Sequence, residues 1–418
     1  MQESRNRRSV MPIPTALVNV LMFVTAGGVF FIRDDWPFGF NGSLLAIWGA
    51  TAVCVIGVLR FSASARGVPI GASEATFFVW LASMALTVGI SGLTRGYPSA
   101  SIFMWREIVV IALIFSAGFL AVKMFRVHPA RLLAWCSVWV LVAAIPIIQH
   151  LVAADQVSRV KIAASVNYVS ASFGAFAVFF AARIMLGSQT RAAVLISLLA
   201  LLAAFTATAM GGTRSVVFGT VASAAVGVLV GLTQVFIRIR SRPISLRSIA
   251  LSIGAIGILS SSFWLLHERL DLGRLLDRFS GEAIAQSTEG RHELWASSMP
   301  VEAAALLMGV PETYPLYSPG SVHPHNLVVS VVRFGGVVPL VVLLAFTGLL
   351  SAQLGWTLLQ RSEPTLHVSV MTVALMLTVI MAYALASGHF TRVWSLYFLL
   401  GFLCALVGPK SAGRVGLS

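Results

Sequence analysis

The stretch from residue 291 to residue 339 reads RHELWASSMPVEAAALLMGVPETYPLYSPGSVHPHNLVVSVVRFGGVVP. It gathers Arg, His, Glu and Pro in a chain that otherwise consists largely of apolar runs. A polar interruption of this length between apolar segments predicts a region that lies outside the membrane. We expect it to form one half of a functional site, with Arg214 in the other half.

The composition of the whole chain is that of a membrane protein. Of its 418 residues, 58% are hydrophobic and only 11% are charged, whereas a soluble domain carries about 25% charged residues. A spanning helix needs about 20 mostly apolar residues, and about twelve such stretches occur here. We therefore expect an all-α polytopic membrane protein with residues 1–418 in a single membrane domain. The expected spans are 11–32, 43–61, 71–93, 101–122, 129–152, 162–186, 191–211, 213–237, 246–267, 325–355, 365–387 and 391–408.

Basic residues concentrate in every second loop, which is the bias of cytoplasmic loops. This pattern predicts that both termini are cytoplasmic. The apolar run 11–32 is longer than the roughly 7–15 residues of a signal-peptide core, so we expect an uncleaved first span. On the outer side, Arg33, Arg95 and Arg392 are interpreted as surface anchors. The net charge of +14 predicts a lipid bilayer partner and no nucleic acid, because no nucleic-acid motif accompanies it.

The loop 267–324 differs from the other loops in length and composition. It lies between the ninth and tenth expected spans and holds more than half of the 15 acidic residues. Apolar residues recur at helical spacing over 270–279 and 293–307. We expect two amphipathic helices on the outer membrane surface, followed by an irregular segment over 309–320.

Arg214 belongs to the sequence GGTRS at 211–215. The Gly-Gly pair ends one helix, and Thr213 is suited to cap the next. Backbone N–H groups at a helix start and a guanidinium together favour phosphate oxygens. The alternative is an arginine that only extends to the membrane surface.

Arg291 opens an amphipathic stretch that contains Trp295. It is a second candidate for binding an anion at the outer face. The alternative is a surface ion pair with Glu289 or Glu293, which contributes little.

His323 and His325 flank a proline, and Asn326 follows them. No third ligand stands at a spacing typical of a metal site, so we expect no metal and no cofactor. A histidine held at a helix start suits a base or a hydrogen-bond partner for a hydroxyl, and His325 is the better placed of the two. The alternative is a capping or interfacial histidine. His323 and Asn326 are expected to contact substrate beside it.

Other charged residues have open interpretations. Arg106 and Glu107 near the outer end of their span predict an ion pair within the membrane, with a functional role as the alternative. Arg159 and Lys161 would add positive charge to an outer anion site. Arg333, beside a Gly-Gly pair, marks either a helix break or the outer limit of its span. Neither a P-loop nor a dinucleotide fingerprint occurs, so the sequence does not predict nucleotide chemistry.

Three motifs in order resemble those of the O-antigen ligase and polymerase superfamily. These are GGTRS, then GRHELW with MGVP in the long loop, then HPHNLVVSVVRFGGVVPL at the following span. The sequence RVKIAASVNY before the sixth span is similar to a weaker motif of that family. Members are bacterial inner-membrane glycosyltransferases of the GT-C type.

The resemblance implies a donor glycan on undecaprenyl diphosphate and, in the ligase branch, a lipid A–core acceptor. It implies transfer at the periplasmic face with inversion and without metal. By motif, Arg214 and Arg291 would bind the diphosphate, and His325 would activate or orient the acceptor hydroxyl. The sequence HPHN leaves a choice of histidine, and we choose His325 because it directly precedes Asn326.

Two rival functions stay open at this point. A polymerase of the same superfamily would use a second lipid-linked glycan as acceptor. A transporter or flippase of lipid-linked glycan would be expected to show inverted repeats and helices broken at the membrane midplane. The sequence shows no internal repeat, and its polar residues cluster near one surface.

Overall fold

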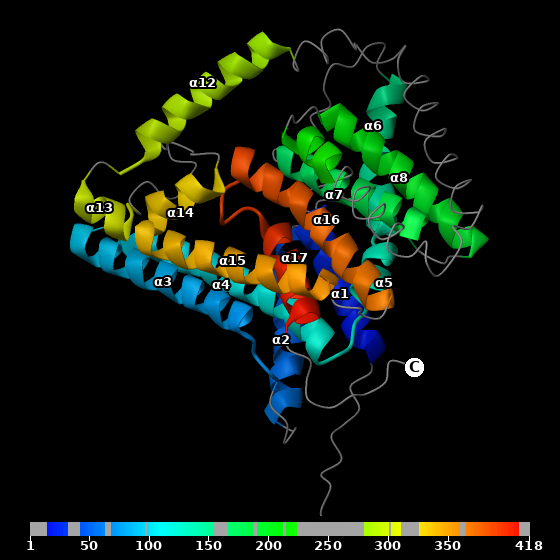
Figure 1. The fold of residues 1–418 in the computed structure, drawn as a ribbon, viewed down its shortest axis with the longest axis horizontal. Helices are drawn as coiled ribbons and strands as arrows, with labels where there is room; N and C mark the ends of the chain where they lie inside the picture. Colours follow the sequence, from blue (N-terminus) through cyan, green and yellow to red (C-terminus); the bar gives the residue numbers. More distant parts are fainter. Residues whose placement is uncertain are drawn as a thin grey trace, which may run out of the picture.

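The computed structural model describes residues 15–31, 42–62, 68–96, 98–153, 166–186, 190–211, 215–223, 280–300, 302–310, 326–359 and 364–408. All regular structure within these ranges is helical, which confirms the all-α prediction. Figure 1 labels the elements α1 (Thr15–Phe30), α2 (Gly42–Ser62), α3 (Ala72–Arg95), α4 (Pro98–Lys123), α5 (Pro129–Trp135), α6 (Ser137–Ala153), α7 (Val166–Leu186), α8 (Arg191–Gly211), α12 (Gly281–Ser298), α13 (Ala303–Met308), α14 (Leu327–Gly335), α15 (Val337–Leu359), α16 (Pro364–Ser387) and α17 (Trp394–Val407).

Six helical segments of the described chain are long and apolar enough to cross a membrane. They are Ser43–Ser62, Ala72–Arg95, Ser101–Lys123, Pro129–Ile147, Val337–Leu359 and Val368–Ser387. Shorter apolar helices occupy Thr15–Phe30, Tyr168–Ile184, Ala192–Thr208 and Trp394–Val407. These helices indicate a membrane protein. The predicted total of about twelve includes 246–267, which lies outside the described residues, and 213–237, of which only 215–223 is described.

Large apolar side chains cover the outside of the bundle. Trp48, Leu93 and Leu359 are 70%, 81% and 84% exposed. Exposing such groups to water costs about 25 cal/mol per Å². A lipid environment removes that cost, which agrees with the membrane assignment.

Helix α17 forms the centre of the molecule and is buried along most of its length. Every residue from Trp394 to Ala405 is buried, as expected of a helix that is apolar all round. It packs along α4 and also contacts α16, α1 and α15 (Figure 1). Gly118 of α4 faces the backbone of α17, where an added Cβ would lie 2.8 Å from the Phe398 carbonyl oxygen. Gly401 of α17 faces the Phe115 carbonyl of α4 in the same way. Small residues of this kind let two membrane helices approach closely.

The expected span 325–355 is divided into α14 and α15. The division falls at Gly336, whose φ is +84° and whose N–H still bonds to the Val332 carbonyl at 2.8 Å. A side chain at Gly336 would also collide with the Leu307 carbonyl of the neighbouring α13. The helix break is therefore present, because α14 ends two residues after Arg333. The other interpretation, the outer limit of the span, agrees with the same structure, because the candidate span Val337–Leu359 begins four residues after Arg333.

Two further expected helices are also divided. The amphipathic stretch 293–307 is not one helix: α12 ends at Ser298, and α13 begins at Ala303. Pro300 explains the break, because the residue before a proline is disfavoured in the helical conformation. The expected span 129–152 turns at Cys136, whose ψ of −5° departs from the helical value.

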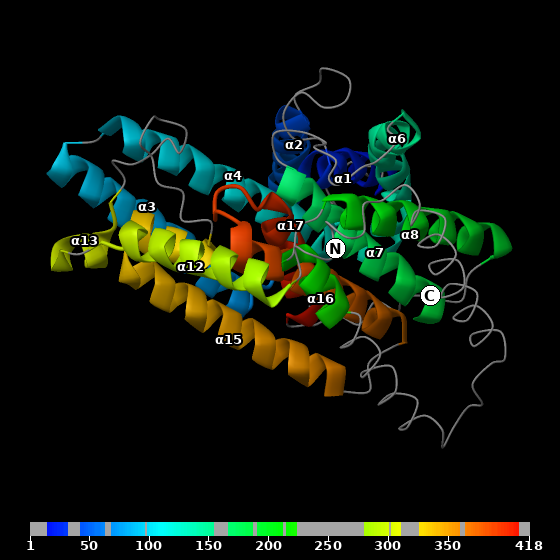
Figure 2. The same cartoon turned by 90° about the horizontal axis from the view of Figure 1, so that it is seen from above.

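The described parts of the long loop and the ends of several apolar helices meet at one end of the bundle, here called the polar end. Arg95 at the end of α3 pairs with Glu302 before α13 at 3.8 Å, and Ser91 donates to the Gly309 carbonyl at 3.0 Å. The N–H of Phe390, between α16 and α17, donates to Ser330 of α14 at 3.3 Å. Figure 1 shows α13 and α14 beside the end of α3, and Figure 2 shows α12 and α13 together on the same side of the bundle.

The glycine contact between α4 and α17 can be tested by substitution. We expect Gly401→Val to destabilise the protein by about 1–3 kcal/mol, because the side chain has no room against the Phe115 carbonyl. Gly348→Val on α15 is the matched control, because an added Cβ there meets no atom within 4 Å. Thermal unfolding of the purified protein in detergent measures both. Equal melting temperatures for the two variants would show that the close contact does not matter.

Candidate functional site

Most of the residues predicted to form the site lie outside the described part of the chain. These are Arg214, His325, His323, Arg159 and Lys161. Their roles remain predictions. Arg291 and Asn326 are described and allow the surroundings of the site to be examined.

Asn326 is the N-cap of α14. Its side-chain oxygen accepts hydrogen bonds from the N–H groups of Val328 at 2.8 Å and Val329 at 3.1 Å. Its amide nitrogen donates to the Leu385 carbonyl of α16 at 2.6 Å. The side chain is only 9% exposed. Asn326 thus starts α14 and connects it to α16.

Arg291 lies within α12 and is partly buried. The helix begins ten residues earlier than Arg291, at Gly281, so Arg291 does not open it. Trp295 follows one turn later and therefore shares a face with Arg291. Its indole N–H is buried and has no hydrogen-bond acceptor among the described residues. A buried donor left in this state calls for an explanation, and a bound ligand is one.

Arg333 connects α12 to α14. Its Nη1 donates to the Ser298 carbonyl at the C-terminal end of α12 at 2.6 Å. The Val310 N–H donates to the Arg333 carbonyl at 2.5 Å. Arg333 therefore holds the described part of the long loop against the membrane helices.

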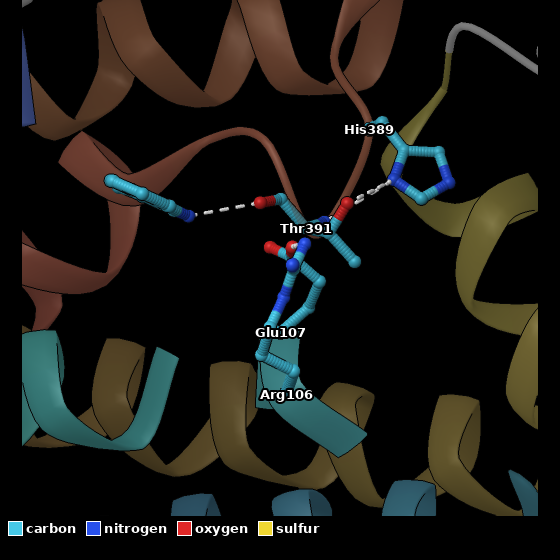
Figure 3. Close-up of polar contacts among 5 residues, drawn as sticks. Arg106, Glu107, His389 and Thr391 are labelled. Atoms are coloured by element: carbon cyan, nitrogen blue, oxygen red, sulfur yellow. Dashed lines mark hydrogen bonds and ion pairs between the residues drawn. The ribbon is translucent and has the colours of Figure 1, made fainter. Parts of the chain in front are cut away.

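The turn between α16 and α17 carries a buried polar pair. His389 is 6% exposed and Thr391 is fully buried. His389 Nδ1 lies 2.9 Å from Thr391 Oγ1, and the Thr391 N–H donates to the same nitrogen at 3.3 Å (Figure 3). Because a backbone N–H can only donate, Nδ1 accepts, and the neutral ring carries its proton on Nε2. Trp394 Nε1 donates to the Thr391 carbonyl at 2.9 Å and fixes the turn further.

Arg106 and Glu107 form the ion pair that the sequence predicts. Arg106 Nη2 lies 2.8 Å from Glu107 Oε1, and Glu107 is 7% exposed. Figure 3 shows both side chains extending from α4 toward the turn that carries Thr391. The Arg106 guanidinium also lies over the Phe103 ring, 5.3 Å from its centroid. The pair thus combines one buried carboxylate with an arginine side chain that is 63% exposed.

Four arginines belong to the helices and the turn that form the polar end. Arg106, Arg291, Arg333 and Arg392 reach it from α4, α12, α14 and the turn before α17. Each guanidinium offers several donors in a planar fork that matches phosphate oxygens. No group of three or more His, Cys, Asp or Glu side chains among the described residues is arranged to hold a metal ion.

His389 and Thr391 do not stand out in the sequence. The available signal is the segment SGHFTR at 387–392, which separates two apolar runs. Arg392, interpreted from the sequence as a surface anchor, is only partly exposed and belongs to this buried turn. The polar end thus contains buried polar side chains that the sequence motifs do not include.

No protein-family model matches the chain, and no curated protein matches it.

Replacing Thr391 tests the buried turn. We expect Thr391→Val to destabilise the protein by about 1–2 kcal/mol, because it leaves a buried imidazole nitrogen without its hydroxyl partner. Thr391→Ser should restore most of the stability. Thr378→Val is the control, because that exposed hydroxyl bonds only within its own helix at 3.0 Å from the Ala374 carbonyl. Thermal unfolding in detergent is the measurement, and a Thr391→Val protein as stable as the control would contradict the assignment.

Proposed function

We propose that this protein is a periplasmic-face, inverting glycosyltransferase of the bacterial inner membrane. It moves an O-antigen glycan from undecaprenyl diphosphate to a hydroxyl of the lipid A–core oligosaccharide. The observation that carries the proposal is the gathering of arginines and polar side chains from distant segments at one end of an apolar helical bundle. The order of the GGTRS, GRHELW and HPHN motifs supports the same conclusion.

The leaving group determines what the arginines do. Negative charge grows on the diphosphate as the bond from its oxygen to the anomeric carbon breaks. Arg214 and Arg291 bind those oxygens and stabilise that charge, which a preorganised guanidinium does without a metal ion. Arg159 and Lys161 add positive charge at the same face. Trp295 offers an indole donor on the Arg291 side of α12.

The acceptor hydroxyl requires a base because it is a weak nucleophile. His325 takes its proton while the acceptor oxygen forms a bond to the anomeric carbon from the face opposite the leaving diphosphate. The configuration at that carbon is therefore inverted. Asn326 supports this role by holding the start of α14 against α16. His323 and Asn326 complete the acceptor side of the site.

A polymerase of the same superfamily is the nearest alternative. It would use the same arginines and base but a second lipid-linked glycan as acceptor. The size of the outer loop relative to the bundle favours the ligase. A transporter of lipid-linked glycan is the alternative of another class.

Transfer in vitro tests the activity and the site together. Purified full-length protein in detergent is mixed with lipid-linked glycan and purified lipid A–core, with and without EDTA. We expect transfer that EDTA does not reduce. Transport alone gives no product in this assay, because detergent leaves no second compartment.

Site variants are measured in the same assay. We expect Arg214→Ala and Arg291→Ala to lower the rate about 10²–10³-fold, and His325→Ala to lower it about 10²–10⁴-fold. Arg291→Lys should retain more activity than Arg291→Ala because it keeps the charge. Arg131→Ala, which removes an exposed arginine of α5, is the control. Full activity in both Arg214→Ala and His325→Ala would show that the assigned site is wrong.

Loss of the gene separates ligase from polymerase. A ligase mutant should accumulate long lipid-linked chains and display lipid A–core without glycan. A polymerase mutant should instead display a core that bears a single repeat. Gel analysis of lipopolysaccharide, with extraction of the lipid-linked pool, distinguishes these outcomes.

A further inference from the structure

A second feature of interest lies away from the polar end. A cavity of about 540 Å³ opens among α1, α5, α6, α7 and α8. Its volume falls within the roughly 300–1,000 Å³ of typical ligand sites. Trp135, Val138 and Ile196 line it and are 47%, 54% and 48% exposed, so an apolar surface leads into it.

The cavity lies near the end of the bundle opposite the polar end. On α7, Tyr168 accepts a hydrogen bond from the Ser395 N–H at the start of α17 and donates one to the Val29 carbonyl near the end of α1. Arg183, which lines the cavity, is fifteen residues further along α7, roughly 22 Å at 1.5 Å per residue. The bias of basic loops predicts that this end faces the cytoplasm.

The lining combines one positive charge with apolar walls. Arg183 is partly buried in the last turn of α7, and none of the described residues that line the cavity is acidic. Asn19 of α1 and Ser137 of α6 add hydrogen-bonding groups to the lining. A guanidinium with polar side chains beside it suits a phosphate diester, and the apolar surface suits acyl chains. Basic pockets between membrane helices on the cytoplasmic side bind anionic lipid head groups.

We propose that this cavity is a binding site for an anionic glycerophospholipid of the cytoplasmic leaflet. The lipid phosphate lies at Arg183, and an acyl chain follows Trp135, Val138 and Ile196. The site is separate from the transfer chemistry proposed above and does not depend on it. Its lipid is a bound component of the fold and not a substrate.

Lipid binding is tested with phosphatidylglycerol as the probe and phosphatidylcholine as the neutral comparison. The full-length protein in detergent is titrated with each lipid, and bound lipid is counted by native mass spectrometry. We expect phosphatidylglycerol to bind more tightly than phosphatidylcholine, and Arg183→Gln to weaken its binding roughly fivefold. Arg183→Lys should keep most of the preference. Ile196→Trp, which fills the cavity, should reduce binding of both lipids.

Arg126→Gln is the matched control, because Arg126 is an exposed arginine that does not line the cavity. Size-exclusion profiles establish that each variant is folded, and Ile196→Trp provides the test of the cavity if Arg183→Gln does not fold. Equal affinity of the wild-type protein for both lipids would overturn the proposal. Unchanged binding of phosphatidylglycerol in Arg183→Gln would also overturn it. An equal loss of binding in Arg126→Gln would do the same, because it would show that the preference comes from the overall charge of the protein.

Discussion

The close contact between the backbones of α4 and α17 determines how the rest of the molecule is arranged. Gly118 and Gly401 each face a carbonyl of the opposite helix. With no side chain between them, α17 is enclosed along most of its length. In a lipid bilayer the hydrophobic effect contributes little to the association of helices, so their association depends on close packing of this kind. The position of α17 in turn places the turn that carries His389 and Thr391 above the ion pair on α4.

The polar end shows how buried polar groups are satisfied in an apolar chain. The Asn326 side-chain oxygen accepts hydrogen bonds and its amide nitrogen donates one. Arg333 donates to the Ser298 carbonyl at the end of α12, and Thr391 is hydrogen-bonded to His389. An unpaired polar group in this environment costs several kcal/mol. Each of these bonds joins segments that are separate in the sequence or fixes a turn between helices. The same bonds hold candidate functional groups in defined positions, which is what a catalytic site requires.

The two ends of the bundle differ in the number of arginines and in the apolar surface around them. The polar end presents several arginines in a region built from loop helices and helix ends, which agrees with the proposed binding and release of a diphosphate. The opposite cavity presents one arginine within mostly apolar walls, which suits a lipid that stays bound. Both proposals rest on the same chemistry between guanidinium and phosphate, but the number of arginines and the surrounding surface differ.

The sequence by itself determined the helical class, the edges of most apolar helices and the pairing of Arg106 with Glu107, because hydropathy and helical periodicity are local properties. It also determined that 291–339 differs from its surroundings. The Gly-Gly pair beside Arg333 left a break within 325–355 open, and only the tertiary structure decided that this segment and 293–307 are divided. Gly336 combines a positive φ with a close approach to the Leu307 carbonyl of α13, and no local pattern contains that contact. The tertiary structure also placed His389 and Thr391 at the polar end, since their importance comes from burial between α4, α14 and α17. The cavity at Arg183 arises for the same physical reason: five helices must meet before a space between them exists.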